Sequence, residues 1–155
     1  TSEKNKPFTE SLDCYDEVLS YDEAKTLDNA QKIMIVDMAG HYGAMKDLHE
    51  HFGDHVKYSC KVGATHLDNL EGDMSQFPGA KPTFFFAPTQ AQKRTEEWGP
   101  GEVQKRIGMS LKEFQIHSDQ WMKVKRGSGL DEIKNTFTEV VQGNIPPNRG
   151  IILSV

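Results

Sequence analysis

The amino-acid sequence predicts an α/β fold built on a doubly wound, mostly parallel sheet. Residues 33–39 (IMIVDMA) form a near-continuous apolar run, which is typical of a parallel strand covered on both faces. Gly40 ends this run, and an apolar helical stripe and a further strand-like segment follow it. The order of strand, helix, strand, helix and strand is the pattern of a Rossmann-like sheet, and 155 residues fit a single domain, residues 1–155.

The first expected elements are a short helix in residues 7–12 and a strand in residues 17–21. Pro7 suits the first turn of a helix, where its missing N–H is not needed. The segment EVLSY (residues 17–21) alternates and carries residues that favour extended backbone. Residues 22–31 (DEAKTLDNAQ) predict a polar helical connector to the next strand.

A helix and two more strands are expected in the middle of the chain. The helix has apolar positions at spacings of four, three and four, namely His41, Met45, Leu48 and Phe52. Gly53 suits its C-terminal cap, and residues 56–64 (VKYSCKVGA) alternate as a strand. Residues 65–82 predict a long surface loop, residues 83–88 (TFFFAP) a short strand, and residues 90–98 a helix.

The C-terminal part predicts two amphipathic helices and a last strand. The first helix follows residues 99–101 (GPG) and is expected to bury one face, formed by Val103, Ile107, Leu111, Phe114 and Trp121. The second covers residues 130–142, with Gly143 ending it and an apolar face formed by Leu130, Ile133, Phe137 and Val140. Residues 150–155 predict a strand that ends the chain inside the sheet.

Composition argues against several function classes. Eighteen Lys and Arg against 23 Asp and Glu give a net charge of -5, which disfavours a nucleic-acid partner, and the basic residues 123–126 are interpreted as the solvated end of a helix. Cys14 and Cys60 are expected to be packed, reduced thiols in or near buried strands. No apolar run reaches 18 residues and no signal peptide is evident, so a cytoplasmic protein without a membrane partner is expected.

Ligands of a parallel sheet bind at the C-terminal ends of its strands, so the strand ends are the candidate sites. The expected ends include residues 37–40 and 62–66, and each carries a glycine that serves either turn geometry or close approach to a ligand. The phosphate-binding pattern GxGxxG is absent from the chain. The segment HEHFGDH contains three histidines, His49, His51 and His55. They do not share one helix face, so no metal site is predicted.

Several motifs resemble a known family. Residues 1–24 resemble the end of the second strand, the helix and the third strand of the quinone-oxidoreductase-like branch of medium-chain dehydrogenases/reductases. IVDMAG is similar to the fourth strand and turn of that branch, KVGATH to the fifth, and FTEVVQGNIPPNRGIILSV to the closing helix and strand. The series CYDEVLSYDE, VDMAG, VGATH, FFFAP, KR and EWGP resembles, more narrowly, a domain-of-unknown-function family, number 2855.

This resemblance implies NADP as the cofactor and hydride transfer to a small carbonyl or enone as the reaction. The residues that would contact the 2′-phosphate end are Thr1, Ser2, Lys4, Asn5 and Tyr21. Those that would approach the nicotinamide and its ribose are Met38, Gly40, Val62 and Gly63, with His66 as the expected catalytic residue. Asp13 departs from the pattern, because the branch usually has Gly there.

The branch also has a substrate domain, a first strand and a glycine-rich turn that find no counterpart in this sequence. The sheet is therefore expected to be incomplete at its N-terminal side, and the chain by itself to be catalytically incomplete. The alternative is a non-catalytic binding or assembly module that forms a homodimer through an exposed sheet edge. A third option is a small hydrolase or lyase that uses His66 with Asp37.

Overall fold

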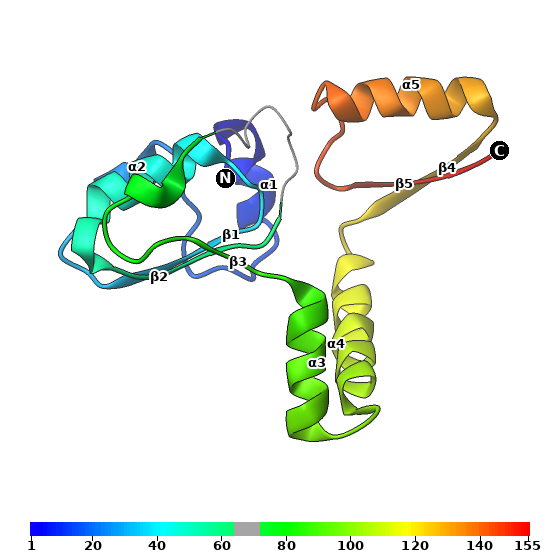
Figure 1. Ribbon diagram of the computed structural model, residues 1–155. Helices are drawn as coiled ribbons and strands as arrows, with labels where there is room; N and C mark the ends of the chain where they lie inside the picture. Colours follow the sequence, from blue (N-terminus) through cyan, green and yellow to red (C-terminus); the bar gives the residue numbers. More distant parts are fainter. Residues whose placement is uncertain (64–71) are drawn as a thin grey trace. The chain divides into compact units, whose positions relative to one another are not determined.

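The computed structural model describes residues 1–63 and 72–155 and has two compact units, Thr1–Pro88 and Thr89–Val155 (Figure 1). Each unit contains a parallel sheet and helices. This confirms the predicted Rossmann-like α/β class. The two units are described separately below, and the expectation of a single domain stays a prediction.

The first unit opens with helical turns and an irregular segment. A 3₁₀ helix, Glu3–Asn5, leads into α1 (Lys6–Glu10), in whose first turn Pro7 lies as predicted. The strand predicted in residues 17–21 is wrong, because among the described residues this segment pairs in extended form only with Thr1, and the Ser20 carbonyl accepts from Ala24 in a helical turn. The helical connector is shorter than predicted and consists of the 3₁₀ helix Glu23–Thr26.

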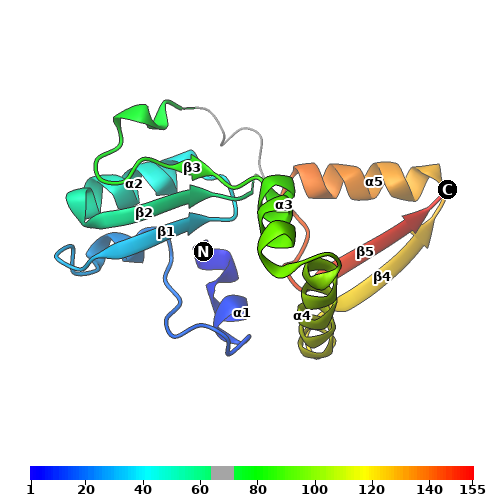
Figure 2. The same cartoon turned by 60° about the horizontal axis from the view of Figure 1, so that its bottom comes forward.

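The sheet of the first unit has the order β1-β2-β3, and all its strands are parallel. These strands are β1 (Ile33–Asp37), β2 (Val56–Lys61) and β3 (Thr83–Phe84), and α2 (Tyr42–Phe52) connects the first two. Figure 2 shows the three arrows pointing the same way with α2 across one face. The predicted strands, helix and terminal Gly53 are confirmed, although β3 is only two residues long.

The core of this unit lies between α2 and the sheet. It is formed by Ile35, Met45, Phe52, Val56 and Phe77. Phe77 belongs to the segment predicted as a surface loop, so the described part of that segment, residues 72–82, contributes to the core. The hydrophobic stripe predicted for α2 therefore does pack on the sheet, because its period matches the helix.

His49 is a fully buried member of this interface. Its Nδ1 lies 2.8 Å from the carbonyl oxygen of Pro78, and its Nε2 lies 2.9 Å from Oγ of Ser59. A carbonyl can only accept, so Nδ1 donates to Pro78 and Nε2 accepts from the Ser59 hydroxyl. The imidazole thus joins α2, β2 and the loop at residue 78, and both its nitrogens are occupied by protein groups.

The opposite face of the sheet is exposed within the described part of the first unit. Met34 is 75% exposed and Phe84 is 70% exposed, and Val36 and Tyr58 are also exposed. The apolar run of β1 predicted burial on both faces, and only the α2 face is covered. Alternating side chains of a strand point to opposite faces, so this pattern leaves every second side chain of β1 uncovered.

The second unit consists of a helical pair and a βαβ element. Most of α3 (Ala87–Trp98) belongs to it, followed by α4 (Glu102–Ser118), β4 (Lys123–Ser128), α5 (Leu130–Val141) and β5 (Arg149–Ser154). The basic residues 123–126 are therefore a strand and not a helix end, because they pair with β5. The last strand is confirmed, and it lies in a separate two-stranded parallel sheet.

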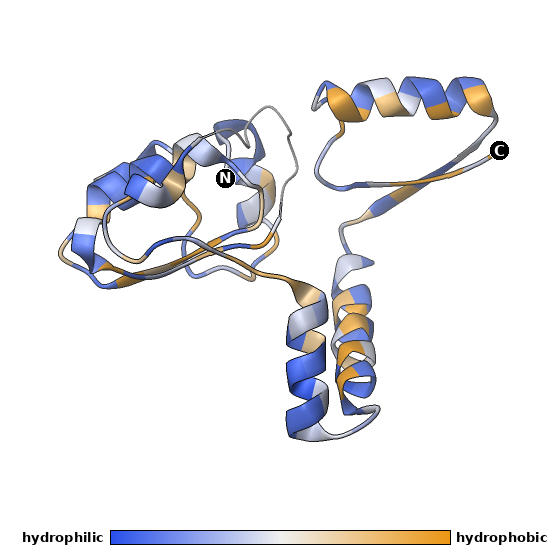
Figure 3. Ribbon diagram, viewed as in Figure 1, coloured by the Kyte–Doolittle hydropathy of each residue, from blue (hydrophilic) through white to orange (hydrophobic). Residues whose placement is uncertain are grey.

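Burial was predicted wrongly for the apolar faces of α4 and α5 and for Cys14. Figure 3 shows apolar residues on both helices, and most residues of the predicted faces are exposed: Ile107, Leu111, Phe114, Leu130, Phe137 and Val140. Of the stripe predicted for α4, Val103 is buried. Cys14 is exposed in an irregular segment, whereas Cys60 is buried in β2 as predicted.

We predict that Ser59→Ala destabilises the first unit. The substitution leaves the buried Nε2 of His49 without its donor, and an unpaired buried polar group costs about 1–3 kcal/mol. Urea denaturation followed by circular dichroism measures the change. Ser75→Ala removes an exposed hydroxyl and is the matched control, so equal midpoints for the two variants would contradict the structural role of the Ser59 hydroxyl.

Candidate functional site

The turn after β1 is organised by Asp37. Its Oδ1 accepts hydrogen bonds from the backbone N–H groups of Ala39, at 3.0 Å, and Gly40, at 2.8 Å. Gly40 has a φ of 75°, in the left-handed region that favours glycine. The other carboxylate oxygen, Oδ2, is buried and has no hydrogen-bond partner among the described residues. One oxygen of the carboxylate therefore shapes the turn, and the option of a hydrolase or lyase that uses His66 with Asp37 stays a prediction.

The ends of β1 and β2 are joined through the backbone of Asp37. Its carbonyl oxygen accepts from the N–H of Val62 at 2.8 Å and from the N–H of Gly63 at 3.3 Å. A Cβ atom on Gly63 would overlap the carbonyl oxygen of Met38. Gly63 is therefore required for the close approach of the two strand ends, which is a packing reason for this glycine.

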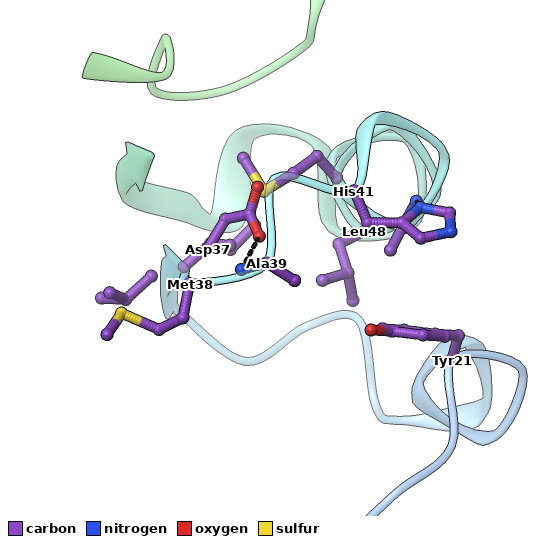
Figure 4. Close-up of a pocket in the computed structure, with 10 residues that line it drawn as sticks. Tyr21, Asp37, Met38, Ala39, His41 and Leu48 are labelled. Atoms are coloured by element: carbon purple, nitrogen blue, oxygen red, sulfur yellow. Dashed lines mark hydrogen bonds between the residues drawn. The ribbon is translucent and has the colours of Figure 1, made fainter. Parts of the chain in front are cut away.

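A hollow of about 230 Å³ lies beside this turn, and we call it the strand-end hollow (Figure 4). It is lined by Tyr21, Ile35, Val36, Asp37, Met38, Ala39, His41, Ala44, Met45 and Leu48. Most of these side chains are apolar, and no Lys or Arg is among them. The hollow thus lies at the C-terminal end of β1, where the rule for parallel sheets places ligands.

Tyr21 and His41 form one wall of the strand-end hollow. Their ring centroids are 5.2 Å apart with the planes tilted by 36°. Figure 4 shows the Tyr21 hydroxyl pointing into the hollow and the His41 ring above the Tyr21 ring. His41 is also the N-cap of α2, since its Nδ1 accepts from the N–H of Ala44 at 3.1 Å. The neutral imidazole therefore carries its proton on Nε2.

Sequence reasoning missed the role of His41, which it assigned to the apolar stripe of the helix. The available signal was its position directly after Gly40 and before the helical pattern, which is an N-cap position. Histidine is not among the preferred N-cap residues, so the pattern alone did not identify it.

Tyr21 is held by polar contacts of its neighbours. Ser20 and Glu23 form a capping box, in which the Ser20 N–H donates to Glu23 Oε2 at 2.8 Å and the Glu23 N–H donates to Ser20 Oγ at 3.2 Å. Lys6 Nζ donates to both carboxylate oxygens of Glu23, at 2.6 and 2.7 Å. The Lys6 contact and then the Ser20 N–H hold the pKa of Glu23 below its ordinary value, and the Glu23 carboxylate raises the pKa of Lys6.

Thr1 supports the same segment from the other side. Its ammonium nitrogen donates to the carbonyl oxygen of Leu19 at 2.9 Å, and the N–H of Tyr21 donates to the Thr1 carbonyl oxygen at 3.0 Å. This exchange is one step of a parallel ladder. Lys25 Nζ lies 2.9 Å from Asp47 Oδ2, which ties the segment after Tyr21 to α2.

The structure brings together some of the predicted cofactor residues and leaves others apart. Tyr21 and Met38 line the strand-end hollow, and Gly40 belongs to the turn at its edge. Val62 and Gly63 follow β2 and do not line the hollow; their N–H groups donate to the carbonyl oxygen of Asp37. The remaining predicted residues of the first turn do not line the hollow: Thr1, Ser2, Lys4 and Asn5. His66 lies outside the described residues.

Across residues 1–63 and 72–155, no three His, Cys, Asp or Glu side chains gather so that they could hold a metal ion. Within the same residues, no helix combines the length and the apolar character needed to cross a bilayer.

The parallel sheet and the hollow at its strand end define the class of Rossmann-like α/β proteins. The chain belongs to the family described as protein of unknown function (DUF2855), whose model matches residues 1–146. Searches of curated proteins and of solved structures found no match. The narrower of the two resemblances in the sequence is thereby confirmed, and the relation to quinone-oxidoreductase-like enzymes stays a prediction.

We predict that Gly63→Ala destabilises the first unit by about 1–3 kcal/mol, because the added methyl group would overlap a backbone carbonyl that cannot move alone. Thermal unfolding measures the change. Gly108→Ala is the control, since a Cβ at this mid-helix position meets nothing within 4 Å and should be neutral or stabilising. An unchanged melting temperature for Gly63→Ala would show that the strand ends are farther apart in solution.

The Glu23 contacts predict an acid-sensitive first unit. The pKa of Glu23 is lower in the folded chain than its ordinary value of 4.5, so its stabilising contribution is present above about pH 4.5. It is lost as the pH falls through the lowered value, when the carboxylate is protonated and releases Lys6. Urea midpoints measured from pH 6 to pH 3 should therefore fall less steeply for Glu23→Gln than for the wild type, and parallel slopes would refute this coupling.

Proposed function

We propose that the strand-end hollow binds the nucleoside end of NADP and that this chain is an NADP-linked oxidoreductase-like domain. The observation that carries the proposal is the position of the hollow at the C-terminal end of parallel strands, with Tyr21 and the turn at Gly40 beside it. Ligands of open parallel α/β sheets bind at this edge. The resemblance to quinone-oxidoreductase-like enzymes assigns Met38 and Gly40 to the nicotinamide and its ribose, and Tyr21 to the 2′-phosphate end of the same cofactor.

The lining favours a flat, uncharged group. Met38, Ala39 and Leu48 offer apolar surface, and the Tyr21 hydroxyl offers a hydrogen-bonding group that points inward. With no Lys or Arg in the lining, a phosphate group would find no opposite charge there. A heteroaromatic base with part of its ribose is therefore the portion that fits, and the phosphates would lie outside the hollow.

The size of the hollow supports this division. Sites for drug-sized ligands have volumes of about 300–1,000 Å³, whereas the strand-end hollow has about 230 Å³. The sequence contains no GxGxxG turn for the pyrophosphate. We therefore propose that this chain binds part of the cofactor and is not catalytically complete by itself. The reduced cofactor, NADPH, when bound, would supply the hydride for a small carbonyl or enone substrate and would leave as NADP.

The second candidate is a non-catalytic assembly module that forms a homodimer. It is favoured by the exposed apolar face of the first sheet, where Met34, Val36 and Phe84 are uncovered in the described part of the unit. Parallel sheets normally have both faces covered. A nucleic-acid partner is not part of either proposal, and the cytoplasmic location stays a prediction.

Titration with NADPH, followed by calorimetry, tests the two candidates. We predict binding near micromolar for the wild type and about tenfold weaker binding for Tyr21→Ala, since an aromatic contact contributes about 0.5–1.5 kcal/mol and 1.4 kcal/mol is a factor of ten. Tyr15→Ala is the matched control, because Tyr15 is exposed and does not line the hollow. No binding at millimolar NADPH, together with a dimeric mass by light scattering, would favour the assembly module instead.

A further inference from the structure

The orientation of Tyr21 depends on contacts that lie outside the strand-end hollow. Tyr21 belongs to a segment that forms no strand, so a sheet ladder does not fix its direction beyond the single step with Thr1. Its preceding residue, Ser20, is buried and is held by the reciprocal hydrogen bonds of the capping box with Glu23. The backbone around Tyr21 is therefore held from two sides, by Thr1 through the Tyr21 N–H and the Leu19 carbonyl, and by Glu23 through Ser20.

Glu23 is in turn anchored to a different element. Both of its oxygens accept from Lys6 Nζ, which comes from α1, while Oε2 also accepts from the N–H of Ser20. This one carboxylate therefore joins α1 to the residue directly before Tyr21. Glu23, Lys6 and Ser20 do not line the hollow, whereas Tyr21, the residue after Ser20, does, so an effect of this network on a ligand is indirect.

We propose that Glu23 is a positioning residue for the nucleotide site, which holds the Tyr21 ring against His41 so that its hydroxyl points into the strand-end hollow. This inference rests on the proposed nucleotide binding and adds a residue that the sequence motifs did not assign to it. The position of Tyr21 then depends on the hydrogen bonds and the ion pair that join Lys6, Glu23 and Ser20. The irregular segment that contains the tyrosine would not fix this position without them.

Two substitutions separate the parts of this network. Glu23→Gln keeps a side-chain oxygen that can accept from the Ser20 N–H and loses the charge that pairs with Lys6. Glu23→Met has a similar length and loses both interactions. If about a tenth of the Glu23→Met molecules keep Tyr21 in the binding orientation and the rest bind about tenfold more weakly, as Tyr21→Ala does, the dissociation constant for NADPH rises about fivefold. The rise for Glu23→Gln is smaller, about threefold.

A double-mutant cycle distinguishes positioning from a general loss of stability. In a Tyr21→Ala background the ring is absent, so Glu23→Met should not weaken NADPH binding further. Asp73→Ala removes another capping carboxylate of the same unit, which bonds to Ser75 and does not line the hollow, and should lower stability without changing affinity. Additive losses in the cycle, or an equal loss for Asp73→Ala, would overturn the inference.

A ligand-free measurement keeps the inference separate from the proposed function. The nuclear Overhauser effect between the ring protons of Tyr21 and His41 should be present in the wild type, whose ring centroids are 5.2 Å apart, and lost in Glu23→Met. If the wild type binds no NADPH, the proposed function fails, and this signal alone decides whether Glu23 places Tyr21. A signal retained in folded Glu23→Met would refute the positioning role.

Discussion

The parallel pairing of β1 with β2 is the constraint on which the rest of the first unit depends. It runs from Ile33 to Asp37 on one strand and from Val56 to Lys61 on the other, so both strands end at the same edge. The Asp37 carbonyl then bonds to Val62 and Gly63 beyond the last paired residues. A side chain on Gly63 would overlap the Met38 carbonyl, so glycine at this position lets the turn after β1 lie against the end of β2, and this turn forms one side of the strand-end hollow.

The other side of the hollow depends on electrostatic and capping interactions. Tyr21 is attached to the unit by short polar contacts of its neighbours with α1 and α2, through Glu23 and Lys25. Such contacts between partly exposed groups are weaker than apolar burial and are sensitive to pH and salt. The proposed site thus combines a rigid wall from the sheet with a wall whose position depends on charged side chains.

Sequence patterns predicted correctly those elements in which the spacing of apolar residues matches the face that is buried in the structure. The segment from β1 to β2 was predicted well, because the apolar run of β1, the stripe of α2 and the terminal Gly53 all indicate the same structure. Residues 17–21 have strand-like composition and form no strand, since extended backbone requires a partner that only Thr1 provides among the described residues. The prediction of a helix end at residues 123–126 was wrong for the opposite reason. These residues pair with β5, and this pairing outweighs a basic composition that is typical of a helix end.

The position of the strand ends indicated where the candidate site lies, and its details depend on contacts that no spacing reveals. The capping role of His41 and the ion pair of Lys6 with Glu23 join residues whose proximity follows from the fold. For the same reason the sequence suggested a ligand-related role for Gly63, whereas the backbone of Met38 explains this glycine by packing.

The short connection through α2 also has a consequence for the order of folding. Segments that are close in sequence close small loops and form early, so the unit β1-α2-β2 is expected to assemble first, with the N-terminal segment docking onto it later through its charged contacts. Opening of that segment then requires less free energy than global unfolding. A fall in pH through the lowered pKa of Glu23, below its ordinary 4.5, would accordingly loosen the ligand site while the βαβ core stays native, so the capacity to bind and the integrity of the fold would be lost in separate steps.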